Sequence, residues 1–136
     1  MRKTKYGDYA KWLRFEVFSR YAIRLIFSSD LKKSAMGRLG HMPSDEFADA
    51  FVFHVKDHGQ SYIFLPLKVS EGVVAHEAWH IIHRVLNFAG VEEFDNEVVA
   101  YHLGWLVEQI YKFKNQISEK RNDQRKPRTG RKKRSA

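Results

Sequence analysis

The sequence predicts an α+β domain in which a small antiparallel or mixed sheet of about three strands packs on two helices. Residues 21–27 alternate in the manner of a strand with one buried face. Two Phe- and Val-rich stretches flank the turn-forming segment 56–61, which indicates a β-hairpin. The segments 71–88 and 95–113 have helical spacing of apolar residues. The first carries an HExxH motif (His-Glu-x-x-His) and the second a glutamate in its first turn.

The remaining elements are predicted from periodicity and from proline. The first twenty residues fit either period, and we expect a helix around residues 12–18. Residues 30–39 predict a short helix. The hairpin strands are expected at 50–55 and 62–69. Pro66 cannot donate a ladder hydrogen bond, so the second of these strands is expected to lie at an edge of the sheet.

Capping residues set the limits of the two long helices. Ser70 is a good N-cap, and Gly90 is suited to the C-terminal end, so the first helix should run over 71–88. Asp95 or Asn96 is expected to cap the second helix.

Composition limits the classes of protein that the chain can belong to. A length of 136 residues suits one domain, and 43% hydrophobic residues favour a folded unit. There is no cysteine, which excludes disulfides and thiolate metal sites. No apolar run approaches the ~20 residues that cross a bilayer, and the polar N-terminus lacks a signal peptide's apolar stretch. We therefore expect a soluble, cytoplasmic protein without a membrane partner.

Basic residues concentrate at the C-terminus. From Lys112 onward there are eleven Lys and Arg against two acidic residues, whereas residues 1–111 hold thirteen basic and fourteen acidic ones. We expect a folded domain at 1–115 and a basic, disordered tail at 116–136, because the tail has too little apolar surface to order itself. The tail is expected either to contact nucleic acid or another acidic partner, or to act only as a solubilising end. The residues expected to make the contact are Arg131, Lys132, Lys133 and Arg134.

The segment His76-Glu77-Ala78-Trp79-His80 carries the chemistry. Two histidines four residues apart lie about 40° apart around a helix and about 6 Å apart along it. Both imidazoles can then reach one zinc ion, at Zn–N distances of about 2.0–2.1 Å. Glu77 is turned by about 100° to the flank of that face, where it can reach a metal-bound water as a general base. The alternative is a helix with two surface histidines and a solvated glutamate.

A further carboxylate is available on the second helix. Glu97 lies seventeen residues after His80, and the loop after Gly90 would let the second helix fold back along the first. Glu97 approaches the histidines only if the helices cross closely. Ala100 and Gly104, three and seven residues further on, permit a short distance between the helices.

HEAWH, followed by Gly90 and the segment NEVVAY (96–101), resembles the gluzincin zinc metallopeptidases, especially their minimal phage-encoded and prokaryotic forms. The resemblance covers about residues 21–113. It implies a three-stranded sheet, an HExxH helix and a glutamate helix, and it makes 1–115 a metallopeptidase-like domain. It also implies Zn²⁺ as the cofactor, with Glu77 polarising the catalytic water and the metal bound by His76, His80 and Glu97.

Other residues have both a functional and a structural interpretation. His83 shares the histidine stripe and is either a further ligand or a polar neighbour of the site. Tyr62 and Tyr101 could donate to an oxyanion, or be partly buried aromatics. Glu93 could replace Glu97 as the ligand, and His102 is a weaker alternative. The residues expected to be structural, exposed or a wall of the site are His41, His54, His58 and Trp79.

Three protein ligands would leave the fourth position of a tetrahedral zinc ion to water, which is typical of a catalytic site. The sequence therefore predicts a metallopeptidase that acts on a protein or peptide substrate. The competing hypothesis is a non-catalytic zinc-containing module that binds nucleic acid or a protein through the basic tail. A membrane-surface protein is a third class, favoured by the charge of the tail alone.

Overall fold

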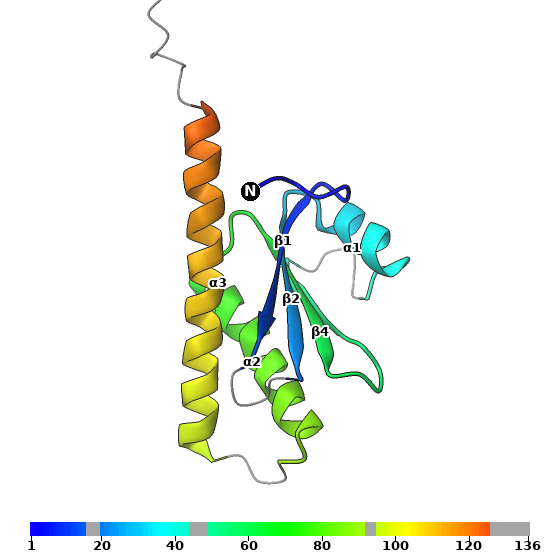
Figure 1. Cartoon of the computed structure of the whole chain (residues 1–136), viewed down its shortest axis with the longest axis vertical. Helices are drawn as coiled ribbons and strands as arrows, with labels where there is room; N and C mark the ends of the chain where they lie inside the picture. Colours follow the sequence, from blue (N-terminus) through cyan, green and yellow to red (C-terminus); the bar gives the residue numbers. More distant parts are fainter. Residues whose placement is uncertain (16–19, 44–48, 92–94, 126–136) are drawn as a thin grey trace, which may run out of the picture.

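The computed structural model describes residues 1–15, 20–43, 49–91 and 95–125. Within these ranges the sheet has four strands in the order β1-β2-β4-β3. The β1–β2 and β3–β4 pairs are antiparallel and β2–β4 is parallel, so the sheet is mixed. The α+β class is confirmed, with four strands in place of about three. The elements, drawn in Figure 1, are β1 (Asp8–Arg14), β2 (Ala22–Ser28), α1 (Leu31–Leu39), β3 (Phe51–His54), β4 (Gln60–Pro66), α2 (Glu71–Phe88) and α3 (Asn96–Arg125).

The additional strand is β1, and it overturns the helix expected around residues 12–18 as far as Arg14; residues 16–18 lie outside the described ranges. It pairs with β2 along its whole length, from Asp8 opposite Ser28 to Arg14 opposite Ala22. Its apolar residues fit both the helical and the strand period. The segment forms a strand because it pairs with β2, a partner that its own sequence does not reveal. Leu13 is buried in the core, while its neighbour Trp12 is exposed on the other face of the sheet.

The expectation that Pro66 marks an edge strand was also wrong. The β3–β4 hairpin forms as predicted, but β4 lies inside the sheet, between β2 and β3. Pro66 is the last residue of β4, opposite Ser28, so its missing N–H falls at the end of the ladder rather than within it. The edge strands are β1 and β3.

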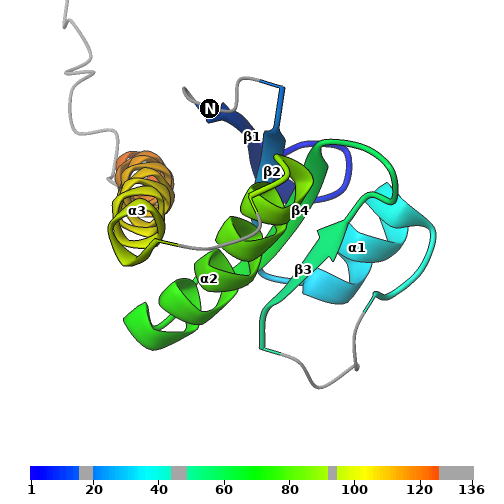
Figure 2. The same ribbon diagram turned by 90° about the horizontal axis from the view of Figure 1, so that it is seen from below.

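Helices α2 and α3 cover one face of the sheet, as the views in Figures 1 and 2 show. The ring of Phe113 on α3 stacks on Phe27 of β2, with centroids 5.9 Å apart. The main core lies between these helices and the inward residues of β2 and β4. Its fully buried members include Ile23, Leu25, Phe27, Ile63, Leu65, Ala78, Ile81, Ile82, Leu106 and Ile110.

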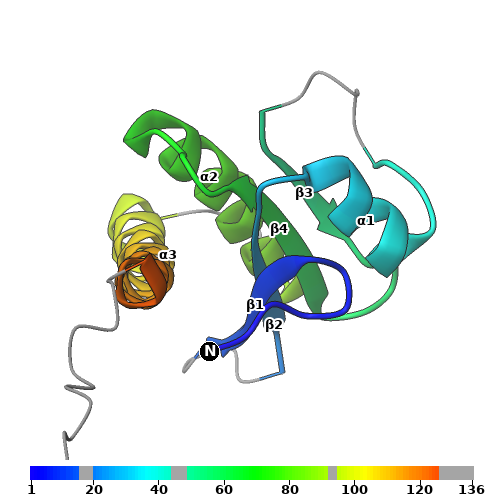
Figure 3. The same ribbon diagram turned by 90° about the horizontal axis from the view of Figure 1, so that it is seen from above.

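Helix α1 lies on the opposite face of the sheet (Figures 2 and 3). Its N-cap is Asp30, whose carboxylate accepts a hydrogen bond from the Lys33 N–H at 3.0 Å. A second, smaller core forms beneath α1, and its buried members are Ile26, Ala35, Phe51 and Phe64. The two cores are therefore separated by the sheet.

The predicted limits of α2 are confirmed, with Ser70 accepting from the Val73 N–H at 3.3 Å. Helix α3 is longer than the sequence predicted and continues through Arg125. Ile117, which fell in the expected tail, is only 2% exposed because it reaches the main core. In Figure 1 the last turns of α3 extend past the sheet. In the part of the chain that the structure describes, no helix has the length and apolarity needed to cross a bilayer.

Candidate metal centre

His76 and His80 lie on the exposed side of α2, one turn apart. Their Nε2 atoms are 3.1 Å apart, and the ring centroids 4.7 Å. Two nitrogens bound to one tetrahedral zinc at about 2.0–2.1 Å would stand about 3.3 Å apart. The same separation also allows a hydrogen bond between a protonated and an unprotonated ring nitrogen. The pair thus has the geometry of two ligands of one metal.

Glu77 lies on the flank of the histidine pair and is turned into the protein. Its side chain is 8% exposed. Burial raises the pKa of this carboxyl above its usual value, while His76 and His80 act in the opposite direction. A carboxylate in such surroundings is a better proton acceptor than one in water, which is a property of a general base.

A pocket of about 370 Å³ opens beside Glu77. Glu77 and His76 line one side of it, and Asp49 and Ala50, which directly precede β3, line the other. Asp49 was missed in the sequence because it precedes a strand in a segment that looks like an ordinary loop. Its place opposite the HExxH helix depends on how β3 packs on α2, which no local pattern reveals.

Glu97 does not join the histidines. It is exposed in the first turn of α3, and its N–H donates to the Asp95 carboxylate at 2.7 Å. Among residues 1–15, 20–43, 49–91 and 95–125, no three His, Cys, Asp or Glu side chains lie together as a metal-binding group. The physical reason is the angle between the helices. The C-terminal end of α2 and the start of α3 lie apart (Figures 1 and 2), so the first turn of α3, which carries Glu97, does not approach the histidines. His76 and His80 fit a zinc ion as a pair, and Glu97 is not placed with them.

Of the other predicted residues, one shares α2 with the histidine pair and two lie on other elements. His83 is half-buried against Trp79, with ring centroids 4.2 Å apart. Tyr101 is 67% exposed on α3. Tyr62 packs against the small core beneath α1, on the face of the sheet that points away from α2. The sheet therefore separates Tyr62 from the histidine pair.

Three further predicted sites lie either outside the described ranges or away from the centre. Glu93 and the four basic residues 131–134 lie outside the described ranges. His102 is 8% exposed on α3, with its ring 5.9 Å from that of Phe15, and burial lowers its pKa.

His54 is a second residue whose place could not be read from the sequence. It lies at the end of β3, and its Nδ1 is 2.8 Å from the Ser61 hydroxyl, which also hydrogen-bonds Tyr21. Burial lowers the pKa of His54, and the positive charges of Arg84 and His80 lower it further. The lowered pKa favours the uncharged form of this imidazole, which Ser61 of β4 holds in place.

The comparisons with known proteins returned no counterpart: no family model, no curated protein and no solved structure matches the chain.

Proposed function

We propose that the chain is a zinc-dependent metallopeptidase whose metal is bound by His76 and His80 and whose general base is Glu77. The observation that carries the proposal is the 3.1 Å separation of the two Nε2 atoms, next to a carboxylate that is mostly buried. A solvated surface glutamate would not need burial, and two unrelated surface histidines would not need to converge.

The residues divide the chemistry between them. Zinc bound at the pair would supply a Lewis acid and a water with a pKa lowered to about 7. The Glu77 carboxylate would accept a proton from the attacking water and return it to the leaving amine of the peptide bond. His54, which Ser61 holds in place, does not line the pocket beside Glu77 and is a candidate hydrogen-bond donor to a more distant part of the substrate.

The substrate is a protein or peptide segment in extended form. Strand β3 is an edge of the sheet and packs against α2, so its free backbone groups lie beside the HExxH helix. An extended peptide can pair with such an edge and place its backbone across the pocket between Asp49 and Glu77.

The third ligand is the part of the proposal that rests on resemblance. Glu97 is the residue that the gluzincin pattern implies, whereas Asp49 is the carboxylate that lines the pocket beside His76. Glu97 would have to move toward the pair with the first turn of α3. Zinc content of single variants separates these two assignments.

The zinc proposal is tested by elemental analysis of the purified chain. We expect one zinc per chain in the wild type and its loss in His76→Ala and His80→Ala. His58→Ala, which removes an exposed histidine of the β3–β4 turn, is the matched control and should keep the metal. Loss of zinc in Glu97→Ala but not in Asp49→Ala would assign the carboxylate to α3, and the reverse result to the pocket. If both histidine variants kept one zinc per chain, the proposed metal centre would be wrong.

The same preparations test catalysis. Glu77→Gln should keep zinc and the fold, but lower peptide hydrolysis by a factor of about 10² to 10⁴, because an amide cannot take the proton. Cleavage sites are found by comparing a proteome digested with the wild type and with this variant. Identical cleavage by two zinc-loaded proteins would leave the non-catalytic module, which binds through its tail, as the better hypothesis.

A further inference from the structure

The face of the sheet that carries α1 is covered at one end only. The buried row Ile26–Phe64–Phe51 lies under α1. The next row across the sheet is Trp12–Arg24–Tyr62–Phe53, and the one after it is Arg14–Ala22–Gln60. Trp12 is 45% exposed, and Arg14 is exposed as well. The two outer rows thus present aromatic rings and guanidinium groups on one surface.

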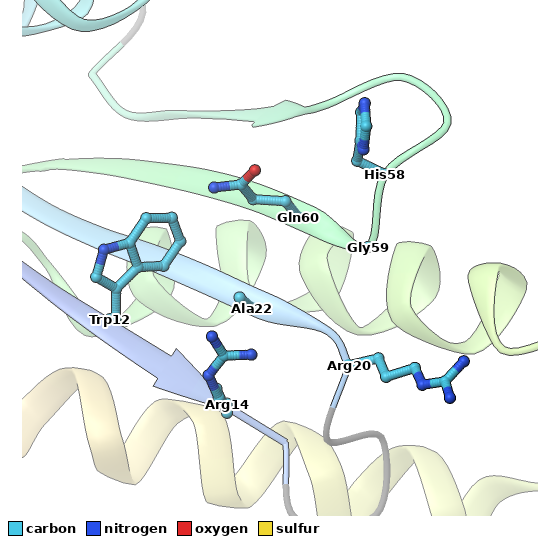
Figure 4. Close-up of a pocket in the computed structure, with 7 residues that line it drawn as sticks. All are labelled: Trp12, Arg14, Arg20, Ala22, His58, Gly59 and Gln60. Carbon is cyan, nitrogen blue, oxygen red and sulfur yellow. The ribbon is translucent and has the colours of Figure 1, made fainter.

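A pocket of about 470 Å³ lies at this end of the sheet. In Figure 4 the side chains of Trp12, Arg14 and Gln60 gather over Ala22, which forms a small floor between them. Arg20 and His58 extend outward at the mouth, from the start of β2 and from the β3–β4 turn. The seven lining residues are Trp12, Arg14, Arg20, Ala22, His58, Gly59 and Gln60.

Trp12 is held in place although it is exposed. The Arg24 guanidinium lies over its ring, 4.9 Å from the centroid, and the Tyr62 ring is 6.3 Å away. A tryptophan fixed by a cation–π contact loses little conformational freedom when a flat ligand stacks on its remaining surface. Such a ring is a platform for an unpaired base, since every base has a face that stacks on an aromatic side chain.

The charge of the pocket favours an anion. Its lining includes two arginines and a histidine, and none of the seven lining residues is acidic. Asp57 belongs to the same turn as His58 but does not line the pocket. A guanidinium group can donate two parallel hydrogen bonds to two oxygens of one phosphate. The Gln60 amide offers both a donor and an acceptor to the edge of a base.

We propose that this pocket binds a nucleotide unit of a single-stranded nucleic acid, with the base stacked on Trp12 and the phosphate bound by Arg14, while Arg20 adds positive charge at the mouth. A duplex is excluded as the ligand because its bases are already stacked and paired. The site lies on the opposite face of the sheet from α2, so the proposal does not depend on the metal centre. With the two sites on opposite faces, the chain could bind a nucleic-acid strand and a peptide at the same time.

The test measures the affinity of the full chain for a short labelled oligouridylate by fluorescence anisotropy, at physiological ionic strength. Trp12→Ala should weaken binding about 5- to 150-fold, the range expected when one stacked base loses its aromatic partner. Trp12→Phe keeps a ring and should retain most of the affinity. Trp79→Ala, which removes a tryptophan with a similar 42% exposure on α2, is the matched control and should bind as the wild type does.

Arg14 provides the second arm of the test. Arg14→Ala should weaken binding and reduce the slope of log affinity against log salt by about 0.7, the contribution of one phosphate contact to a single strand. Arg2→Ala, in the exposed N-terminal segment, is its control and should bind the strand as the wild type does. This arm also decides the matter if Trp12→Ala fails to fold, which a thermal melt of each variant reveals.

Further probes separate the base from the phosphate. A duplex and inorganic polyphosphate should lose little affinity in Trp12→Ala, since neither offers an unpaired base. An equal loss for polyphosphate, unchanged oligouridylate affinity in Trp12→Ala, or no binding by the wild type would each overturn the proposal. The same loss in a His76→Ala background would show that the pocket works whether or not the zinc proposal holds.

Discussion

At the scale of single residues, Asp8 is a buried charge that ties β1 to α1. Its carboxylate is fully buried and accepts two hydrogen bonds from the Arg38 guanidinium, at 2.8 and 2.7 Å. The Ser34 and Thr4 hydroxyls donate to it as well. Burial alone would raise the pKa of Asp8, but these hydrogen bonds and the charge of Arg38 lower it below its usual value.

Because of this network, the free energy of unfolding should fall at acidic pH. A carboxyl with a lowered folded-state pKa stabilises the fold above its unfolded pKa of about 3.9, and this stabilisation is lost as pH falls through the folded pKa. Asp8→Asn should therefore lower the free energy of unfolding by about 3 kcal/mol at neutral pH, because it leaves Arg38 without its partner. It should also reduce the loss of stability on acidification. Urea denaturation over a series of pH values measures both effects.

Asp57→Asn is the control for this substitution. Asp57 is exposed in a turn with φ of 60°, a conformation that asparagine tolerates. Its stability curve should follow the wild type. A curve for Asp8→Asn that runs parallel to the wild type at all pH values would contradict the role assigned to the buried carboxylate.

At the scale of elements, α3 contains residues that the composition of the sequence assigned to a tail. Ile117 is its last buried residue, and the helix continues to Arg125 with a polar surface. A single apolar side chain one helical turn after Phe113 extends the packed face of the helix, which an average over a basic segment hides.

Ile117→Ala should lower the free energy of unfolding by about 2 to 3 kcal/mol, because it leaves a cavity against the main core. Ser118→Ala, at the exposed neighbouring position, should change it by less than about 0.5 kcal/mol. Thermal and urea denaturation compare the two. If both variants were as stable as each other, residues 116–125 would contribute nothing to the folded domain and would belong to the tail.

The elements with strong local signals were predicted from the sequence. The predicted limits of helix α2, from Ser70 to Gly90, and the predicted start of α1, at Ser29 or Asp30, agree with the structure, where Asp30 is the cap, because capping is decided within a few residues. The strand β1 and the inner place of β4 were missed, since both depend on partners distant in the sequence. The candidate site divides in the same way. The histidine pair follows from a spacing of four on one helix, whereas Asp49 and His54 come to it through packing.

At the scale of the whole molecule, the sheet separates two surfaces with different chemistry. The histidine pair and the pocket at Glu77 lie on the α2 side, and the pocket at Trp12 lies on the α1 side. The basic residues 126–136 are outside the described ranges, and the folded part is close to neutral. The two proposed nucleic-acid contacts can therefore be tested separately, one through stacking on Trp12 and one through the charge of the tail.

Deletion of residues 126–136 should weaken binding to single strands and duplexes alike, because it removes six basic side chains that attract phosphate without regard to base pairing. The salt dependence of the remaining affinity should fall by more than it does in Trp12→Ala. Anisotropy titrations at several salt concentrations distinguish the two. If the deletion left duplex binding and its salt dependence unchanged, the tail would be a solubilising segment.

The parallel pairing of β2 with β4 also constrains the order in which the chain assembles. The β3–β4 hairpin closes over a short turn and can form within microseconds. Pairing of β2 with β4 must instead close the long segment between Ser28 and Gln60, which contains α1 and β3. The entropy of that loop is lost before the contacts between the strands form, so this step should limit the folding rate. The antiparallel pair of β1 and β2 closes over a short connection, with Arg14 opposite Ala22, so by the same reasoning it can form early, before β2 pairs with β4.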